Sequence, residues 1–247
     1  MDGVTLPLFL GAMFVGGLTS GLAGFAMGLV VSGICLHFVP PLENAALIVG
    51  YSVVTQSYGI WKLRQVLRWR QVAPLIIGGA LGAPAGTALL TTVDPASLRS
   101  AVGGLLVLYG AYGLARPKFR PIHAGRGADF GVGFFNGLLG GLTGLAGVIV
   151  AVYCQLRDWT KDVQRAVFQP VTLSAALFSL LSLAIAGAVT AETVIHYLLG
   201  LPFMAAGVWS GFHLYGKLDD AAFRKVILAL LLLSGLTLLL PASIFGR

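Results

Sequence analysis

Two glycine-rich stretches decide the fold of this chain: Gly16-Gly17-Leu18-Thr19-Ser20-Gly21-Leu22-Ala23-Gly24 and Gly137-Leu138-Leu139-Gly140-Gly141-Leu142-Thr143-Gly144. At a constant spacing of 120 residues, Gly17 aligns with Gly137, Gly21 with Gly141 and Gly24 with Gly144. A second window repeats at a spacing of 125, and its matched pairs are Gly82 with Gly207, Gly86 with Gly211, Asp94 with Asp219, and Arg99 with Arg224. Matches in the same order in two windows predict a duplicated half.

The composition indicates that lipid is the solvent for most of the chain. Of 247 residues, 57% are hydrophobic and 10% are charged, whereas about a quarter are charged in soluble domains. The net charge of +7 fits the excess of Lys and Arg in cytoplasmic loops, and no basic helix with interleaved aromatics suggests a nucleic acid partner. The motifs of metalloproteases, P-loop enzymes and serine hydrolases are missing, as is Cys/His metal spacing, so we expect no enzyme, cofactor or metal.

Six apolar segments have the length of ordinary membrane spans. They are approximately Asn44–Lys62, Val72–Leu90, Leu98–Leu114, Ala166–Ala186, Val194–Tyr215 and Phe223–Leu240. The two glycine stretches lie in longer apolar segments, Leu6–Val39 and Phe130–Leu156. At about 20 residues per crossing, each of these is long for one crossing and short for two.

The basic residues favour a hairpin in each long segment. If each segment crosses once, the two faces of the membrane hold 9 and 7 of the 16 Lys and Arg. If each dips in and returns, 14 share one face and only Arg99 and Arg247 lie on the other, which obeys the positive-inside rule. The sequence therefore predicts an all-α polytopic membrane protein of two inverted repeats, each a re-entrant helical hairpin plus three transmembrane helices.

This topology divides the chain into a first repeat over 1–115, a basic cytoplasmic loop over 116–127 and a second repeat over 128–247. Both termini are then periplasmic. Two discontinuous segments that meet near the midplane are typical of a transporter site, so we expect a secondary transporter of a small anion by alternating access, with the substrate between the hairpin tips. An anion channel and a non-transporting membrane partner protein remain alternatives, and a homodimer is left open.

Glycines at the tips admit two interpretations, ligand contact through exposed backbone N–H groups or close helix packing. We favour packing for Gly82, Gly86, Gly207 and Gly211, and binding for the two tip clusters. Neutral polar side chains near the tips fit an oxyanion, although interhelical hydrogen bonds would use the same residue types. The candidate substrate-binding residues are Thr19, Ser20, Gly21, Gly24, Ser52, Gln56, Gly141, Thr143, Gly144, Gln169 and Thr172.

Ionisable groups deep in the membrane are scarce. His37, His196 and His213 are candidates for proton coupling, but interfacial positions are favoured for all three. Glu43 and Glu192 are expected at the outer surface. Basic side chains on the inner face, Arg64 and Arg165 among them, are expected to gather anions.

The glycine pattern that runs from Gly17 to Gly28, its second copy at Gly137–Gly147 and the Asp94-Pro-x-x-Leu-Arg99 element resemble the sulfite exporter TauE/SafE family of permeases. The resemblance covers nearly the whole chain. It implies that the chain is a protein of the bacterial inner membrane that exports a sulfur-containing anion such as sulfite or an organosulfonate.

Overall fold

The computed structural model describes residues 5–24, 27–35, 38–89, 95–115, 122, 124–143, 147–157, 159–185, 187 and 189–239. These residues form helices and connecting turns, with no strand among them. The helices are α1 (Thr5–Ala23), α2 (Met27–Cys35), α3 (Pro41–Leu63), α4 (Trp69–Leu89), α5 (Pro95–Ala115), α6 (Arg126–Thr143), α7 (Val148–Leu156), α8 (Lys161–Ile185), α9 (Ala191–Lys217) and α10 (Asp220–Leu239).

The helices agree with the predicted segments. Each of the six expected spans is one helix, α3, α4, α5, α8, α9 or α10, with ends that differ by a few residues. Each long segment is a long helix followed by a short one, of 19 and 9 residues in the first copy and 18 and 9 in the second. The chain therefore breaks once in each copy, directly after the glycine-rich stretch.

The helices group into two compact units that do not follow the halves of the sequence. Unit 1 comprises residues 1–59, 176–218 and 241–247, and unit 2 comprises 60–175 and 219–240. Unit 1 holds α1, α2 and most of α3 together with α9 from the second half. Unit 2 holds α6, α7 and the first part of α8 together with α4 and α5 from the first half, and α10.

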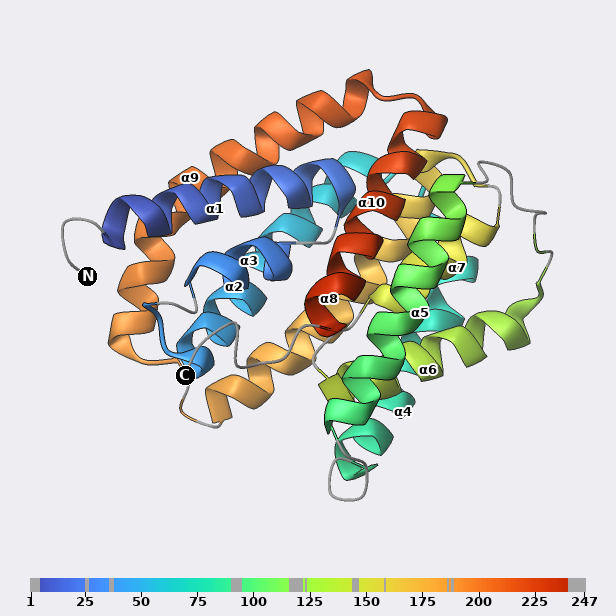
Figure 1. Ribbon diagram of the computed structural model, residues 1–247, viewed down its shortest axis with the longest axis horizontal. Helices are drawn as coiled ribbons and strands as arrows, with labels where there is room; N and C mark the ends of the chain where they lie inside the picture. The colour runs from blue at the N-terminus through green and yellow to red at the C-terminus, as the bar shows by residue number, and fades with distance from the viewer. Residues whose placement is uncertain are drawn as a thin grey trace. The chain divides into compact units, whose positions relative to one another are not determined.

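In unit 1, α1 and α9 are parallel and lie side by side (Figure 1). Glycines on both helices allow the two backbones to approach closely. A Cβ on Gly17 would lie 2.3 Å from the carbonyl oxygen of Met204, and one on Gly211 would lie 2.3 Å from that of Leu18. Gly21 and Gly207 make equivalent contacts with the facing helix. Close approach through small residues is the usual basis of helix pairing in lipid, where no hydrophobic force brings helices together.

In unit 2, α4 and α6 pair in the same way and are also parallel. A Cβ on Gly82 would lie 2.0 Å from the carbonyl oxygen of Phe134, and one on Gly137 would lie 2.2 Å from that of Gly79. The packing interpretation of Gly82, Gly86, Gly207 and Gly211 is therefore confirmed. In the same unit, α5 and α10 lie antiparallel through Gly110 and Gly235 (Figure 1).

Contacts within unit 2 place its basic loops at one end. The backbone N–H of Ile122, just before α6, donates to the carbonyl oxygen of Leu156 at the end of α7 (2.8 Å). The N–H of Lys161, where α8 begins, donates to Asp220, where α10 begins (2.9 Å). Because α4 is parallel to α6 and α5 antiparallel to α10, the start of α4 and the end of α5 belong to this end as well.

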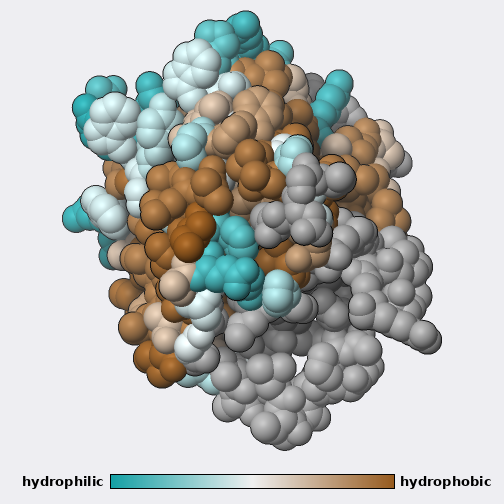
Figure 2. All heavy atoms as spheres, turned by 90° about the vertical axis from the view of Figure 1, so that its left-hand side faces the viewer, coloured by the Kyte–Doolittle hydropathy of each residue, from teal (hydrophilic) through white to brown (hydrophobic). Residues whose placement is uncertain are grey.

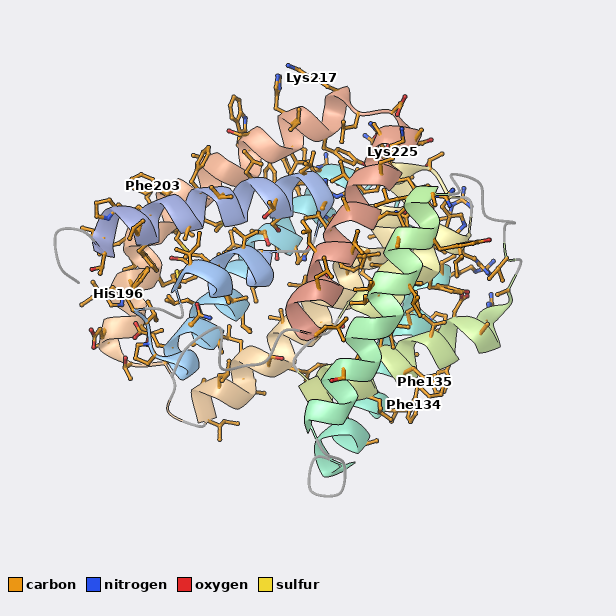
Figure 3. All side chains as sticks on the ribbon, viewed as in Figure 1. Phe134, Phe135, His196, Phe203, Lys217 and Lys225 are labelled. Atoms are coloured by element: carbon orange, nitrogen blue, oxygen red, sulfur yellow. The ribbon has the colours of Figure 1, made fainter. Side chains whose placement is uncertain are left out.

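The surface of the helices is apolar, as lipid contact requires. Phe135 on α6, Ile185 on α8 and Trp209 on α9 are 60%, 80% and 65% exposed, and Figure 3 shows Phe135 on the outside of α6. In Figure 2, brown residues cover most of the coloured surface, with teal residues along the top, at the upper left and in one central patch. Of the described helices, α1, α8 and α9 are long and apolar enough to cross a membrane by composition and length.

Candidate functional site

The first helix break lies between α1 and α2 in unit 1. Gly24 follows the last residue of α1 with φ of 86°, a left-handed conformation that a side chain would strain. Its N–H still donates to the carbonyl oxygen of Ser20 (2.7 Å), which closes the last turn of α1. The helix α2 then returns alongside α1, with Val31 and Met27 packed against Gly16. Glycine is therefore required at the point where the chain reverses.

Gln56 of α3 ties this break to the next helix. Its side-chain Nε2 donates to the carbonyl oxygen of Gly24 at 2.7 Å, and the residue is only 5% exposed. The contact joins residues 32 positions apart and fixes the orientation of the amide, because a carbonyl oxygen accepts and does not donate. The amide oxygen Oε1 is buried and has no hydrogen-bond partner among the described residues.

The second helix break lies between α6 and α7 in unit 2, and it is built differently. Gly147 has φ of 102° and precedes α7 directly. The side-chain oxygen of Asn136 accepts hydrogen bonds from the N–H groups of Gly147 (2.9 Å) and Val150 (3.4 Å), deep in the protein. Asn136 of α6 thus satisfies N–H groups at the start of α7.

Side chains of α8 cover the second break. A Cβ on Gly147 would lie 2.8 Å from the methyl group of Thr172 and 3.2 Å from the ring of Phe168. The Thr172 hydroxyl donates within its own helix, to the carbonyl oxygens of Phe168 and Gln169. Gln169 is 1% exposed, and its Oε1 is a buried atom without a partner in the described part of the chain.

The other predicted residues are distributed as follows. Ser20 is buried in the last turns of α1, the Thr19 hydroxyl donates to the carbonyl oxygens of Val15 and Gly16, and Gly21 packs on Val208 of α9. Ser52 is half-buried on α3, one turn before Gln56. Gly141 and Thr143 belong to the last turn of α6, and Gly144 lies outside the described residues.

The structure thus brings Gln56 to Gly24 in unit 1, and Thr172 to Gly147 in unit 2. It does not turn the hydroxyls of Thr19 and Thr172 outward, because each is bonded to its own helix. A correction concerns Arg165, which was expected on the inner face as an anion-gathering residue. It is 1% exposed in the second turn of α8 and is the largest fully buried side chain of the described residues.

Charged and polar side chains join the start of α6 to the end of α7. The Tyr153 hydroxyl of α7 donates to the buried carboxylate of Asp129 on α6 (2.5 Å), and Arg157 approaches the same carboxylate at 3.9 Å. Arg157 also donates to the carbonyl oxygen of Ala124 and lies over the ring of Trp159. These contacts hold the start of α6 and the end of α7 together. Sequence reasoning missed them, because no local pattern links two residues so far apart in the chain.

A second polar pair lies at the far end of unit 1 from Lys217. Nδ1 of His196 on α9 is 2.6 Å from a carboxylate oxygen of Glu43 on α3, and both side chains are about nine-tenths buried. Figure 3 shows His196 near the start of α9. The Tyr51 hydroxyl donates to the carbonyl oxygen of Tyr197 (2.9 Å), and their rings stack.

Glu43 was expected at the outer surface, so sequence reasoning missed its contact with His196. His213 is exposed, and His37 lies outside the described residues.

The chain can now be compared with known proteins. The sequence model of the sulfite exporter TauE/SafE family matches residues 8–238. A curated relative from Cupriavidus necator, described as a probable sulfite/organosulfonate exporter TauE, is 26% identical over 228 residues, which are 90% of this chain and 88% of the relative. No solved structure matches the chain. A match that extends from α1 to the last turn of α10 includes both breaks and every helix, and the protein therefore belongs to the sulfite exporter TauE/SafE family of membrane permeases.

Proposed function

We propose that this protein is a secondary transporter of the bacterial inner membrane that exports a small sulfur-containing anion such as sulfite or an organosulfonate. The observation that carries the proposal is the pair of broken helices, each with a left-handed glycine, where buried Gln56 bonds to the first glycine and Thr172 and Phe168 of α8 pack on the second. Discontinuous helices supply charged helix ends and unpaired backbone groups at membrane depth, and such groups bind ions in transporters. The family and the relative from Cupriavidus necator supply the substrate class.

Helix pairing supports the duplicated architecture. The pair α1 with α9 in unit 1 corresponds to α6 with α4 in unit 2, if each helix is replaced by its counterpart in the other half. The helices α5 and α10 are counterparts of each other, so the exchange leaves this pair as it is. Exchange of the halves thus leaves the pairing unchanged, as expected for a duplicated chain.

Charge supports the inversion of the second repeat. In unit 1, α1 is parallel to α9, which ends at Lys217, so α1 begins at the end away from that charge. In unit 2, α6 begins at the basic end, together with the ends of α5 and α7. If basic ends face the cytoplasm, the first hairpin enters from the periplasm and the second from the cytoplasm. Arg99, near the start of α5, lies at the opposite end of unit 2.

The hydrogen bond between Ile122 and Leu156 supports the re-entrant interpretation, because it joins the entry and the exit of the second hairpin. A reporter fused after Arg247 tests the topology. We expect it to be periplasmic, and a cytoplasmic reporter refutes the inverted-repeat proposal.

Transport itself is tested with purified protein in liposomes loaded with sulfite or with a small organosulfonate. We expect saturable efflux that is accelerated by the same anion on the opposite side, because alternating access exchanges substrates. Gln56→Ala should lower efflux at least about tenfold, since it removes a buried polar group at the first break. Gln65→Ala, at an exposed position in the loop after α3, is the matched control and should transport normally.

The other outcomes are distinct. Flux that does not saturate and shows no exchange identifies an anion channel, with a pore lined by the same breaks. The absence of both flux and anion binding favours a partner protein and refutes the proposal.

A further inference from the structure

Gln56 presents an acceptor, not a donor, at the first break. Its Nε2 is used by the carbonyl oxygen of Gly24, and this contact fixes which end of the amide is the oxygen. The remaining atom, Oε1, is buried and has no partner among the residues that the structure describes. An amide oxygen left unsatisfied in the interior is costly, so the site is built to receive a hydrogen-bond donor.

The surroundings of Gln56 contain both signs of partial charge. The break is where α1 ends, at Ala23, and where α2 begins, at Met27. The last carbonyl groups of a helix are negative, and the first N–H groups are positive and attract anions. An acceptor in the form of Gln56 Oε1 therefore lies at the same break as an anion-attracting helix end.

At the second break, fewer N–H groups remain available to bind an anion. Asn136 already accepts from the N–H groups of Gly147 and Val150, so the N-terminal end of α7 is partly capped by the protein itself. The first break is thus the better candidate for the contact that distinguishes one substrate from another.

We propose that Gln56 is a specificity-determining residue that accepts a hydrogen bond from the substrate, and that the transported species carries a hydrogen-bond donor beside its anionic group. The donor is a hydroxyl or ammonium group of an organosulfonate, or the hydroxyl of a protonated oxyanion. This inference rests on the proposed function. An anion that only accepts hydrogen bonds, such as sulfate or ethanesulfonate, leaves Oε1 unsatisfied. Its oxygen atoms are also repelled by the lone pairs of Oε1, so it binds more weakly.

The test compares sulfonates of nearly equal size in the purified protein by titration calorimetry. Isethionate carries a hydroxyl group, taurine carries an ammonium group, and ethanesulfonate carries neither. We expect isethionate and taurine to bind at least about tenfold more tightly than ethanesulfonate, because the matched hydrogen bond is made only with a donor.

Two substitutions assign this preference to Gln56. Gln56→Met keeps the length of the side chain and removes the acceptor with its lone pairs, so the preference should fall to about one, with weaker binding of isethionate and taurine and no weakening for ethanesulfonate. Gln56→Glu restores an acceptor and should restore the preference for taurine. Unfolding of each variant without ligand checks that the turn at Gly24, which loses the Nε2 hydrogen bond in both variants, still forms.

Each contrary result is clear. Equal binding of isethionate and ethanesulfonate by the native protein means that water satisfies Oε1 and overturns the inference, as does a preference that survives Gln56→Met. Binding that depends on sodium, when sodium is replaced by choline, assigns Oε1 to a coupling cation and also overturns it. If no anion binds and none is transported, the proposed function itself fails.

Discussion

Close packing of α4 against α6 gives a sharp prediction for Gly137→Ala. The new Cβ would lie 2.2 Å from the carbonyl oxygen of Gly79 and 2.7 Å from its Cα, whereas ordinary contact begins at 3.4 Å. The shortfall to the oxygen is 3.4 minus 2.2, or 1.2 Å. Because the obstacle is backbone, α4 and α6 must separate, and the neighbouring contact of Gly133 with Leu75 loosens with them.

Overpacking of this kind lowers the free energy of unfolding by about 1–3 kcal/mol. For a chain of this size, each kcal/mol lowers the melting temperature by about 2–4 °C. Thermal unfolding in detergent, followed by tryptophan fluorescence, measures the loss. Gly131→Ala is the control, because it lies on the same helix with nothing within 4 Å of its Cβ, and Ala should stabilise an open helical position by about 0.5–1 kcal/mol. If both variants unfold at the same temperature, the glycine contact does not hold α4 and α6 together.

Three further substitutions or labels test separate contacts. Glu43→Gln weakens the charge-assisted bond to His196 and should lower the free energy of unfolding by about 1 kcal/mol, whereas Glu192→Gln, at an exposed position, should not; equal melting temperatures would show that the pair adds nothing. Tyr153→Phe removes the donor to buried Asp129 and should speed hydrogen exchange of α7; unchanged exchange would mean that other contacts hold the hairpin base. Cys35 and Cys154 are both buried, so a maleimide should label them only after unfolding, and rapid labelling of the native protein would contradict this burial.

The sequence predicted the helices well because lipid imposes a simple length rule. About 20 apolar residues cross a bilayer, and the six predicted spans match α3, α4, α5, α8, α9 and α10. The two segments of unusual length predicted the two breaks, and the glycine repeat predicted their correspondence. The same repeat could not distinguish tip glycines that pack from those that turn, since both need a missing Cβ. Gly17 and Gly21 pack on α9, whereas Gly24 turns the chain.

The polar residues show where sequence reasoning stops. Burial and partners depend on which helices pair, and the pairs join residues far apart in the chain. Arg165 read as a surface charge and is buried, and Glu43 read as a surface charge and bonds His196, 153 residues later.

By itself, then, the sequence determined the membrane class, the approximate helix boundaries and the family, because each follows from local length, composition and spacing. Only the tertiary structure decided that α1 pairs with α9 and α4 with α6, and that the Gln56 amide donates to Gly24 through its nitrogen. The physical reason is that backbone approach and amide orientation are set by the partner across a contact, and a linear pattern does not name that partner.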